Sequence, residues 1–206
     1  KDFIRDTAPV FRKPTIAQLG EFIAPTFQAL IDGAKYVDDR LCAIIDELRP
    51  DLIVEDNVVT FPALPASGRR WARIVSCNPT ELKDHEVPPP FSGLPLSDRR
   101  DWDEYWLELR KTHDAIHADF DQYCQERGAP PLPPDDFLHQ SPWLNMYLYP
   151  EEIDYRRARP LGPHWHNLQA SVRATDPAWD VPESLAGGEG PLIYLSLGSL
   201  GSYRRS

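Results

Sequence analysis

The sequence predicts an α/β fold in which helices flank a parallel β-sheet. Leu52, Ile53 and Val54 form a short apolar run with two β-branched members, which is typical of a strand buried on both faces of such a sheet. A long helical stripe precedes this run, and a short helix and a second strand are expected after it. Helices that alternate with strands in this way indicate parallel βαβ units.

The helical stripe before the central run extends from Ile16 to Leu48, with apolar residues at steps of three and four. Pro25 is expected to split it into two helices, because proline lacks the N–H that a helix interior uses. The second helix then spans residues 26–48. Pro50 ends it, since proline disfavours helical backbone at the residue before it. One apolar stripe fits a helix that lies on a sheet.

The segments after the central run continue the same rhythm. A short helix is expected over residues 61–67, with Pro62 in its first turn, and a strand over residues 71–77. Residues 81–96 form a long proline-rich loop, and loops of more than about 12 residues in a compact domain are usually functional or disordered. A further short strand is expected over residues 144–149.

The clearest helix in the sequence is predicted between Ser97 and Gly128. Ser97 is a favourable N-cap, and Asp101 in the first turn would interact favourably with the helix dipole. Aromatic and aliphatic residues from Trp102 to Cys124 recur on one face. Gly128 is expected to end the helix, because glycine readily takes the left-handed conformation that follows a helix C-terminus.

Bulk properties exclude several classes of protein. A formal net charge of −10 and a pI near 5.0 disfavour nucleic-acid binding. The three cysteines, Cys42, Cys77 and Cys124, lack the spacing of a disulfide framework or zinc site, and we expect them to be buried thiols of a cytoplasmic protein. His113 and His117 lack a third ligand at a suitable spacing, and the His164-x-His166 spacing is common by itself, so no metal is expected. No apolar run approaches the roughly 20 residues of a membrane span.

Glu55 and Asp56 follow the central apolar run, where the predicted strand leaves the sheet. In open α/β sheets, ligands bind at the carboxyl ends of the strands. These two acids are therefore the best candidates for chemistry in the sequence. Solvated loop acids with no chemical role are the alternative, and the spacing alone leaves both interpretations open.

Four segments carry a resemblance to a known family. They are residues 50–57 (PDLIVEDN), the strand leading into Asn78-Pro79, residues 159–163 (RPLGP) and residues 193–199 (IYLSLGS). In this order they resemble UDP-glycosyltransferases of the GT-B class, in particular the bacterial macrolide glycosyltransferase branch. The resemblance covers residues 26–202 and implies two Rossmann-like domains that face each other across a cleft.

The resemblance also implies a division of the chain. Residues 1–165 would be an acceptor-binding N-terminal domain that lacks its first strands, and residues 166–190 an interdomain linker. Residues 191–206 would be the first strand of a nucleotide-sugar-binding C-terminal domain. The chain is thus expected to be part of a longer enzyme and to be inactive by itself.

The implied reaction is inverting transfer of a sugar from a nucleoside diphosphate, expected to be UDP, to a hydroxyl of a small lipophilic acceptor. No cofactor is expected, since the nucleotide sugar is a co-substrate. The family uses a histidine as the general base, and Asp56 matches the aspartate that orients it; alternation along the strand should point Glu55 elsewhere. The matching histidine would precede Lys1, so this chain does not contain it.

The resemblance assigns ligand contacts as well. Positions that line the acceptor pocket match Asn57, Asn78, Phe91 and Trp102, and positions near the donor diphosphate match Gly198 and Ser199. Two other interpretations remain: a non-catalytic α/β module that binds a ligand or partner, and an α/β hydrolase. The second is disfavoured, because the sequence has no Gly-x-Ser-x-Gly elbow.

Overall fold

The computed structural model describes residues 2–170, 175, 177, 180–188, 190–193 and 195, with side chains from residue 5 onward. The chain divides into two compact units, Lys1–Ser171 and Val172–Ser206. In the second unit, the helix α6 (Glu183–Ala186) is described. Gly198 and Ser199, with most of the predicted strand and turn around them, lie outside the described residues.

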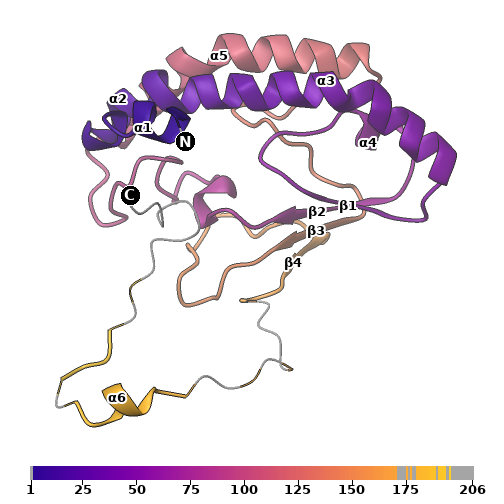
Figure 1. The fold of residues 1–206 in the computed structure, drawn as a ribbon. Helices are drawn as coiled ribbons and strands as arrows, with labels where there is room; N and C mark the ends of the chain where they lie inside the picture. Colours follow the sequence, from indigo (N-terminus) through magenta and orange to yellow (C-terminus); the bar gives the residue numbers. More distant parts are fainter. Residues whose placement is uncertain are drawn as a thin grey trace. The chain divides into compact units, whose positions relative to one another are not determined.

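The first unit is built on a four-stranded sheet in which all strands are parallel, in the order β1-β2-β3-β4 (Figure 1). The strands are β1 (Ile53–Asp56), β2 (Trp71–Val75), β3 (Leu144–Tyr147) and β4 (Trp165–Asn167). The α/β fold with a parallel, helix-flanked sheet that the sequence predicts is therefore confirmed. β4 was not predicted: it has three residues, too few for a periodic pattern, and it overlaps the start of the expected linker.

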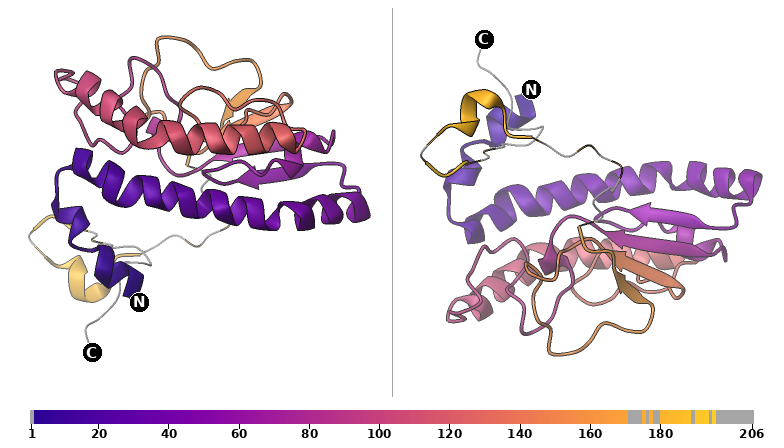
Figure 2. Two further views of the ribbon diagram at one scale, coloured as in Figure 1. Left: turned by 90° about the horizontal axis from the view of Figure 1, so that it is seen from above. Right: turned by 90° about the horizontal axis from the view of Figure 1, so that it is seen from below.

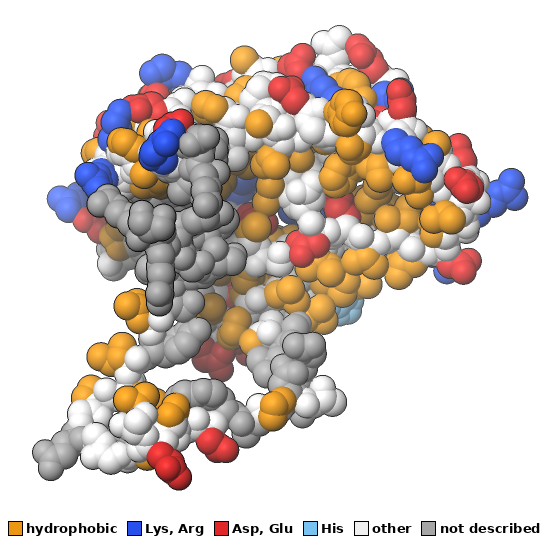
Figure 3. Space-filling view, viewed as in Figure 1, with side chains coloured by type: hydrophobic (Ala, Val, Ile, Leu, Met, Phe, Trp, Pro, Cys, Tyr) orange, Lys and Arg blue, Asp and Glu red, His pale blue; other side chains and the backbone are white. Residues whose placement is uncertain are grey.

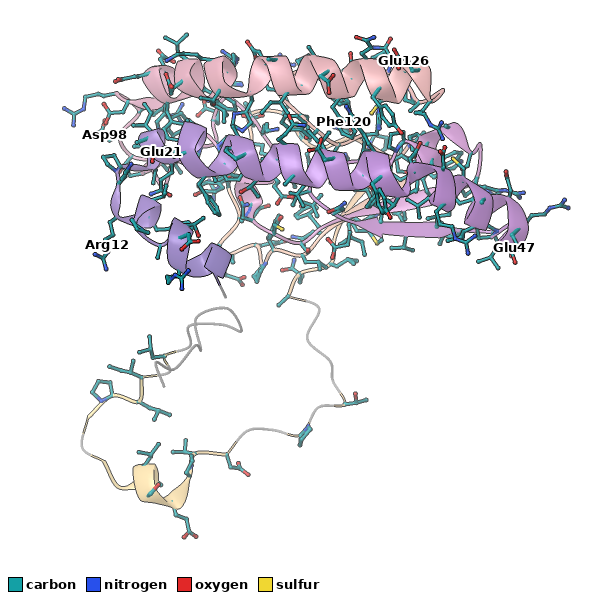
Figure 4. The ribbon with its side chains drawn as sticks, turned by 45° about the horizontal axis from the view of Figure 1, so that its top comes forward. Arg12, Glu21, Glu47, Asp98, Phe120 and Glu126 are labelled. Atoms are coloured by element: carbon teal, nitrogen blue, oxygen red, sulfur yellow. The ribbon has the colours of Figure 1, made fainter. Side chains whose placement is uncertain are left out.

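Two long helices, α3 (Ala24–Leu48) and α5 (Trp102–Glu126), lie side by side on the same face of the sheet (Figures 1 and 2). They run in parallel, because Lys35 pairs with Asp119 at 2.6 Å and, further along both helices, Asp38 pairs with Arg127 at 2.6 Å. Phe120, labelled between the two helices in Figure 4, is fully buried against α3. This helical layer forms the main core of the unit.

Short elements connect or extend these helices and strands. α4 (Ala63–Ala66) joins β1 to β2 and packs on the end of α3. The others are α1 (Asp2–Thr7), η1 (Val10–Arg12), α2 (Thr15–Gln18), η2 (Leu19–Ile23) and η3 (Pro79–Glu81). Among the described residues, no helix is long and apolar enough to cross a lipid bilayer.

The predicted break at Pro25 does not occur. The helical path continues from α2 through η2, which is a π-helical turn, directly into α3. Pro25 lies in the first turn of α3, where its missing N–H is tolerated. The π turn changes the hydrogen-bond spacing just before the proline, so the chain passes it without leaving a helical path.

The prediction that Ser97 is the N-cap was also wrong. α5 begins at Trp102, and its N-cap residue is Asp101. Asp98 instead closes a turn: its carboxylate accepts a hydrogen bond from the Arg100 backbone at 3.2 Å and pairs with the Arg100 guanidinium at 2.6 Å. The C-terminal prediction was correct, since Gly128 has a φ of +84° just past the helix end.

The prediction that the central run is buried on both faces was wrong. β1 is an edge strand, and both long helices cover the same face of the sheet, so only one face of β1 is packed. Leu52 and Val54 are 52% and 55% exposed, whereas Glu55 is 4% exposed. Hydrophobic side chains accordingly gather on the surface at the β1 end of the sheet (Figure 3).

The three cysteines differ in their exposure, contrary to the prediction that all are buried. Cys124 is buried in α5, Cys42 is half-buried and Cys77 is exposed. Cys77 lies in the loop that follows the carboxyl end of β2, and it lines a cavity. Its place in a loop after the strand explains its exposure.

Candidate functional site

A cavity of about 570 Å³ lies beside the carboxyl end of β2. Its walls come from α3, α5, the loop after β2, the proline-rich loop and residues 132–138. This volume falls within the range of roughly 300–1,000 Å³ that is usual for sites of small molecules. The location also fits the rule that parallel sheets bind ligands at the carboxyl ends of their strands.

Aromatic rings form much of the cavity wall. The Phe27 ring lies 5.9 Å from the Phe91 ring, edge to face, and 4.9 Å from the Phe137 ring. Leu30 and Leu109 add aliphatic surface from α3 and α5. Such a wall favours ligands with a large apolar body.

Two of the four predicted acceptor-binding residues line the cavity, namely Asn78 and Phe91. The Asn78 side chain accepts a hydrogen bond from the Thr80 backbone at 3.0 Å and so caps η3. Phe91 has a φ of +67°, an uncommon conformation for a residue with a side chain, and 37% of it is exposed. The backbone of the proline-rich loop thus holds the Phe91 ring at the cavity wall.

The other two predicted acceptor-binding residues lie elsewhere. The Asn57 side chain accepts a hydrogen bond from the Val58 backbone at 2.9 Å. Trp102 is buried at the start of α5, with the Arg99 guanidinium 4.8 Å from the centre of its ring. Neither residue is part of the cavity wall.

Asp56 is exposed at the carboxyl end of β1. Its Oδ1 accepts a hydrogen bond from the Ser76 hydroxyl at 2.7 Å. Ser76 precedes Cys77, which lines the cavity. The pKa of the Cys77 thiol is raised, chiefly by burial, then by Glu81 and least by the Asp56 charge. Asp56 therefore lies at the rim of the cavity rather than inside it.

Glu55 points the opposite way from Asp56 and is buried, as the alternation along a strand requires. Burial raises the pKa of its carboxyl from 4.5 to about 7, and the nearby Arg73 charge and Phe61 backbone N–H only partly oppose this rise. Neither carboxylate oxygen makes a hydrogen bond of ordinary geometry with a described residue. Glu55 is thus a buried acid that changes charge near neutral pH.

Arg73 is a functional candidate that the sequence analysis missed. It sits opposite Glu55 in the sheet register, is 2% exposed and lines the cavity. Next in the same register come Asn145 and Trp165, and the Trp165 ring centre lies 5.8 Å from the Arg73 guanidinium. The sequence did contain a signal for it, because a charged residue between the apolar residues Ala72 and Ile74 of a predicted strand is unusual.

Two histidines on α5 also line the cavity. His113 donates from Nδ1 to the Leu109 carbonyl at 3.0 Å, and burial lowers its pKa. His117 donates from Nε2 to the Pro133 carbonyl at 2.9 Å. In the described part of the chain, no group of three or more His, Cys, Asp and Glu side chains is placed to hold a metal ion.

The structure is thus an α/β domain with a parallel sheet and an apolar cavity beside the carboxyl ends of its strands. Comparisons with models of known protein families and with curated proteins gave no match. The cavity and the four segments that resemble glycosyltransferases are therefore the features that bear on function.

Proposed function

We propose that this chain supplies the acceptor-binding domain of a glycosyltransferase. The enzyme would transfer a sugar, with inversion, from a nucleoside diphosphate to a hydroxyl of a small lipophilic acceptor. Residues 1–165 would hold the acceptor, and residues 191–206 would begin the domain that holds the nucleotide sugar, expected to be a UDP-sugar.

The observation that carries the proposal is the position of the apolar cavity relative to Asp56. The cavity takes in Asn78 and Phe91, two of the positions expected to bind an acceptor, and Asp56 lies at its rim through Ser76 and Cys77. A lipophilic acceptor in this cavity would have one end near that carboxylate.

The proposed chemistry assigns Asp56 a positioning role. A hydroxyl is a weak nucleophile at neutral pH, so transfer is faster when a general base takes its proton. A carboxylate beside a histidine fixes the tautomer of the ring and stabilises the imidazolium that forms. Asp56 would do this for a histidine on another segment of the enzyme, while the cavity orients the acceptor hydroxyl toward that base.

The test is acceptor-dependent transfer by the natural protein that contains these residues. UDP release from UDP-glucose would be measured with a panel of lipophilic alcohols and phenols, and the products would be weighed by mass spectrometry. We expect release to rise and saturate with at least one acceptor, with a hexose added to it. Release that is absent, or that does not depend on acceptor across the panel, would refute the proposal.

A non-catalytic binding module is the second candidate, and one observation favours it. The Asp56 carboxylate already has a structural role, because its Oδ1 accepts a hydrogen bond of 2.7 Å from the Ser76 hydroxyl and so ties β1 to the segment after β2. In this interpretation the cavity captures a ligand without chemistry. Saturable binding of lipophilic ligands with no transfer in the same panel would favour this alternative.

A further inference from the structure

Arg73 stands out because it is charged and buried, and its Nε has no hydrogen-bonding partner among the described residues. It is 2% exposed and lines the cavity. Its Nε is buried without a hydrogen-bonding partner, and the contact of its guanidinium that the structure describes is with the Trp165 ring, 5.8 Å from the ring centre. Buried arginines are nearly always paired, because a guanidinium removed from water loses hydrogen bonds that the protein must replace.

The other cationic side chains of the cavity wall already have acidic partners. Lys83 lies 3.6 Å from the Asp136 carboxylate, and Arg110 pairs with Asp135 at 3.2 Å. Arg73 is therefore the cation of the described wall that remains available to an anion from outside the chain.

The acids near Arg73 neutralise it only in part. Glu55 and Glu81 both interact electrostatically with it, but neither forms a hydrogen bond with it. Burial is the largest influence on both carboxyls and raises the pKa of each, so their ionised forms are disfavoured where they lie. The guanidinium thus keeps a positive field at the inner wall of an apolar cavity.

We propose that the cavity binds a lipophilic carboxylate, whose charged group pairs with Arg73 and whose apolar body lies against Phe27, Phe91 and Phe137. A carboxylate matches the planar fork of a guanidinium and can accept two hydrogen bonds from it. That the ligand is also the sugar acceptor, and hence a hydroxy acid, rests on the proposed function.

The charge of the cavity wall selects a monoanion over a dianion. The wall carries three cations, Arg73, Lys83 and Arg110, and four acids, Glu81, Asp114, Asp135 and Asp136. One unpaired cation balances one ligand charge, whereas a phosphate dianion would meet repulsion from the surrounding acids. Neutral ligands of the same shape would leave the guanidinium unpaired and should bind more weakly.

The test compares two probes of the same size, 6-hydroxy-2-naphthoic acid and 6-hydroxy-2-naphthamide. Binding to the 206-residue chain would be measured by isothermal titration calorimetry at pH 6, where Glu55, with a pKa of about 7, is mostly protonated and does not compete for Arg73. We expect the acid to bind at least tenfold more tightly than the amide. Arg73→Gln should remove this preference and leave the affinity for the amide within about twofold.

Arg110→Gln is the matched comparison, because Arg110 is a cation of the same wall that Asp135 already pairs. It should keep the preference for the acid. Circular dichroism would establish that each variant folds. If Arg73→Gln does not fold, Glu55→Gln carries the test: at pH 8 it removes a competing negative charge and should raise the affinity for the acid several-fold but not for the amide.

Equal binding of acid and amide by the wild-type chain, a preference that survives Arg73→Gln, or no effect of Glu55→Gln would overturn the proposal. The binding test and the sugar-transfer test can fail independently of each other. A preference for the acid without any sugar transfer would refute glycosyl transfer and leave the carboxylate site. Transfer to neutral phenols with no preference for the acid would support glycosyl transfer and refute the carboxylate site.

Discussion

The buried carboxyl of Glu55 makes the stability of this protein depend on pH in a calculable way. Its pKa is about 7 in the folded chain against 4.5 in an unfolded one. The folded state therefore holds this proton more tightly, so the associated stability is fully present below pH 4.5 and is lost as the pH rises through 7. At about 1.4 kcal/mol per pKa unit, the loss above pH 7 is about 3 kcal/mol.

Replacement of Glu55 by glutamine, which mimics the protonated acid, should remove this loss. We expect Glu55→Gln to be more stable than the wild type by about 3 kcal/mol at pH 8 and by less than about 1 kcal/mol at pH 5. Urea unfolding followed by tryptophan fluorescence would measure both values, since Trp71 is buried next to the site. Glu47→Gln, an exposed change on α3, serves as the control.

A difference in the free energy of unfolding between Glu55→Gln and wild type that is the same at pH 5 and pH 8 would refute this explanation. Such a result would mean that the carboxylate is hydrated or well paired in the folded chain. A pH-dependent gain in Glu47→Gln of similar size would show instead that the effect comes from the overall charge of the protein.

Two pairs of substitutions test the packing around α3 and α5 by urea unfolding. Asp38→Ala should cost about 2–4 kcal/mol, because Asp38 is fully buried and accepts hydrogen bonds from Arg127 and the Ala63 backbone; Asp39→Ala removes the exposed partner of the same arginine and should cost less than about 1 kcal/mol. Equal costs would contradict this account of the ion pair. Gly33→Ala should stabilise by about 0.5–1 kcal/mol, since Gly33 is helical with open space around its Cα. Gly128→Ala should destabilise by about 1 kcal/mol because of its φ of +84°. A shift of the same sign in both glycine variants would refute the argument.

Local periodicity was sufficient to predict the main elements of the fold. The apolar stripe that ends at Leu48 and the β-branched run at residues 52–54 located both ends of α3 and β1 to within two residues. The effect of Pro25 was predicted wrongly because the π-helical turn before it cannot be recognised from amino-acid composition or periodicity. The edge position of β1 could not be predicted, since it depends on which strands pair and not on the strand itself.

The candidate site was predictable in position but not in its inner chemistry. The rule that ligands bind at carboxyl ends of strands led to Glu55 and Asp56, and the family resemblance added Asn78, which lines the cavity. Alternation also predicts that Glu55 and Asp56 face opposite ways. Which of the two becomes buried depends on the face that α3 and α5 cover, and the position of Arg73 opposite Glu55 depends on the strand register.

The most direct test of the proposed role of Asp56 is the rate of sugar transfer by the natural protein after Asp56→Asn. The account predicts a loss of about 10²–10⁴-fold in kcat with the KM for acceptor little changed, because asparagine cannot stabilise an imidazolium. Asp51→Asn, at the opposite end of β1, should keep the wild-type rate. Equal rates for the two variants would contradict the assignment of Asp56 as the residue that orients the catalytic base.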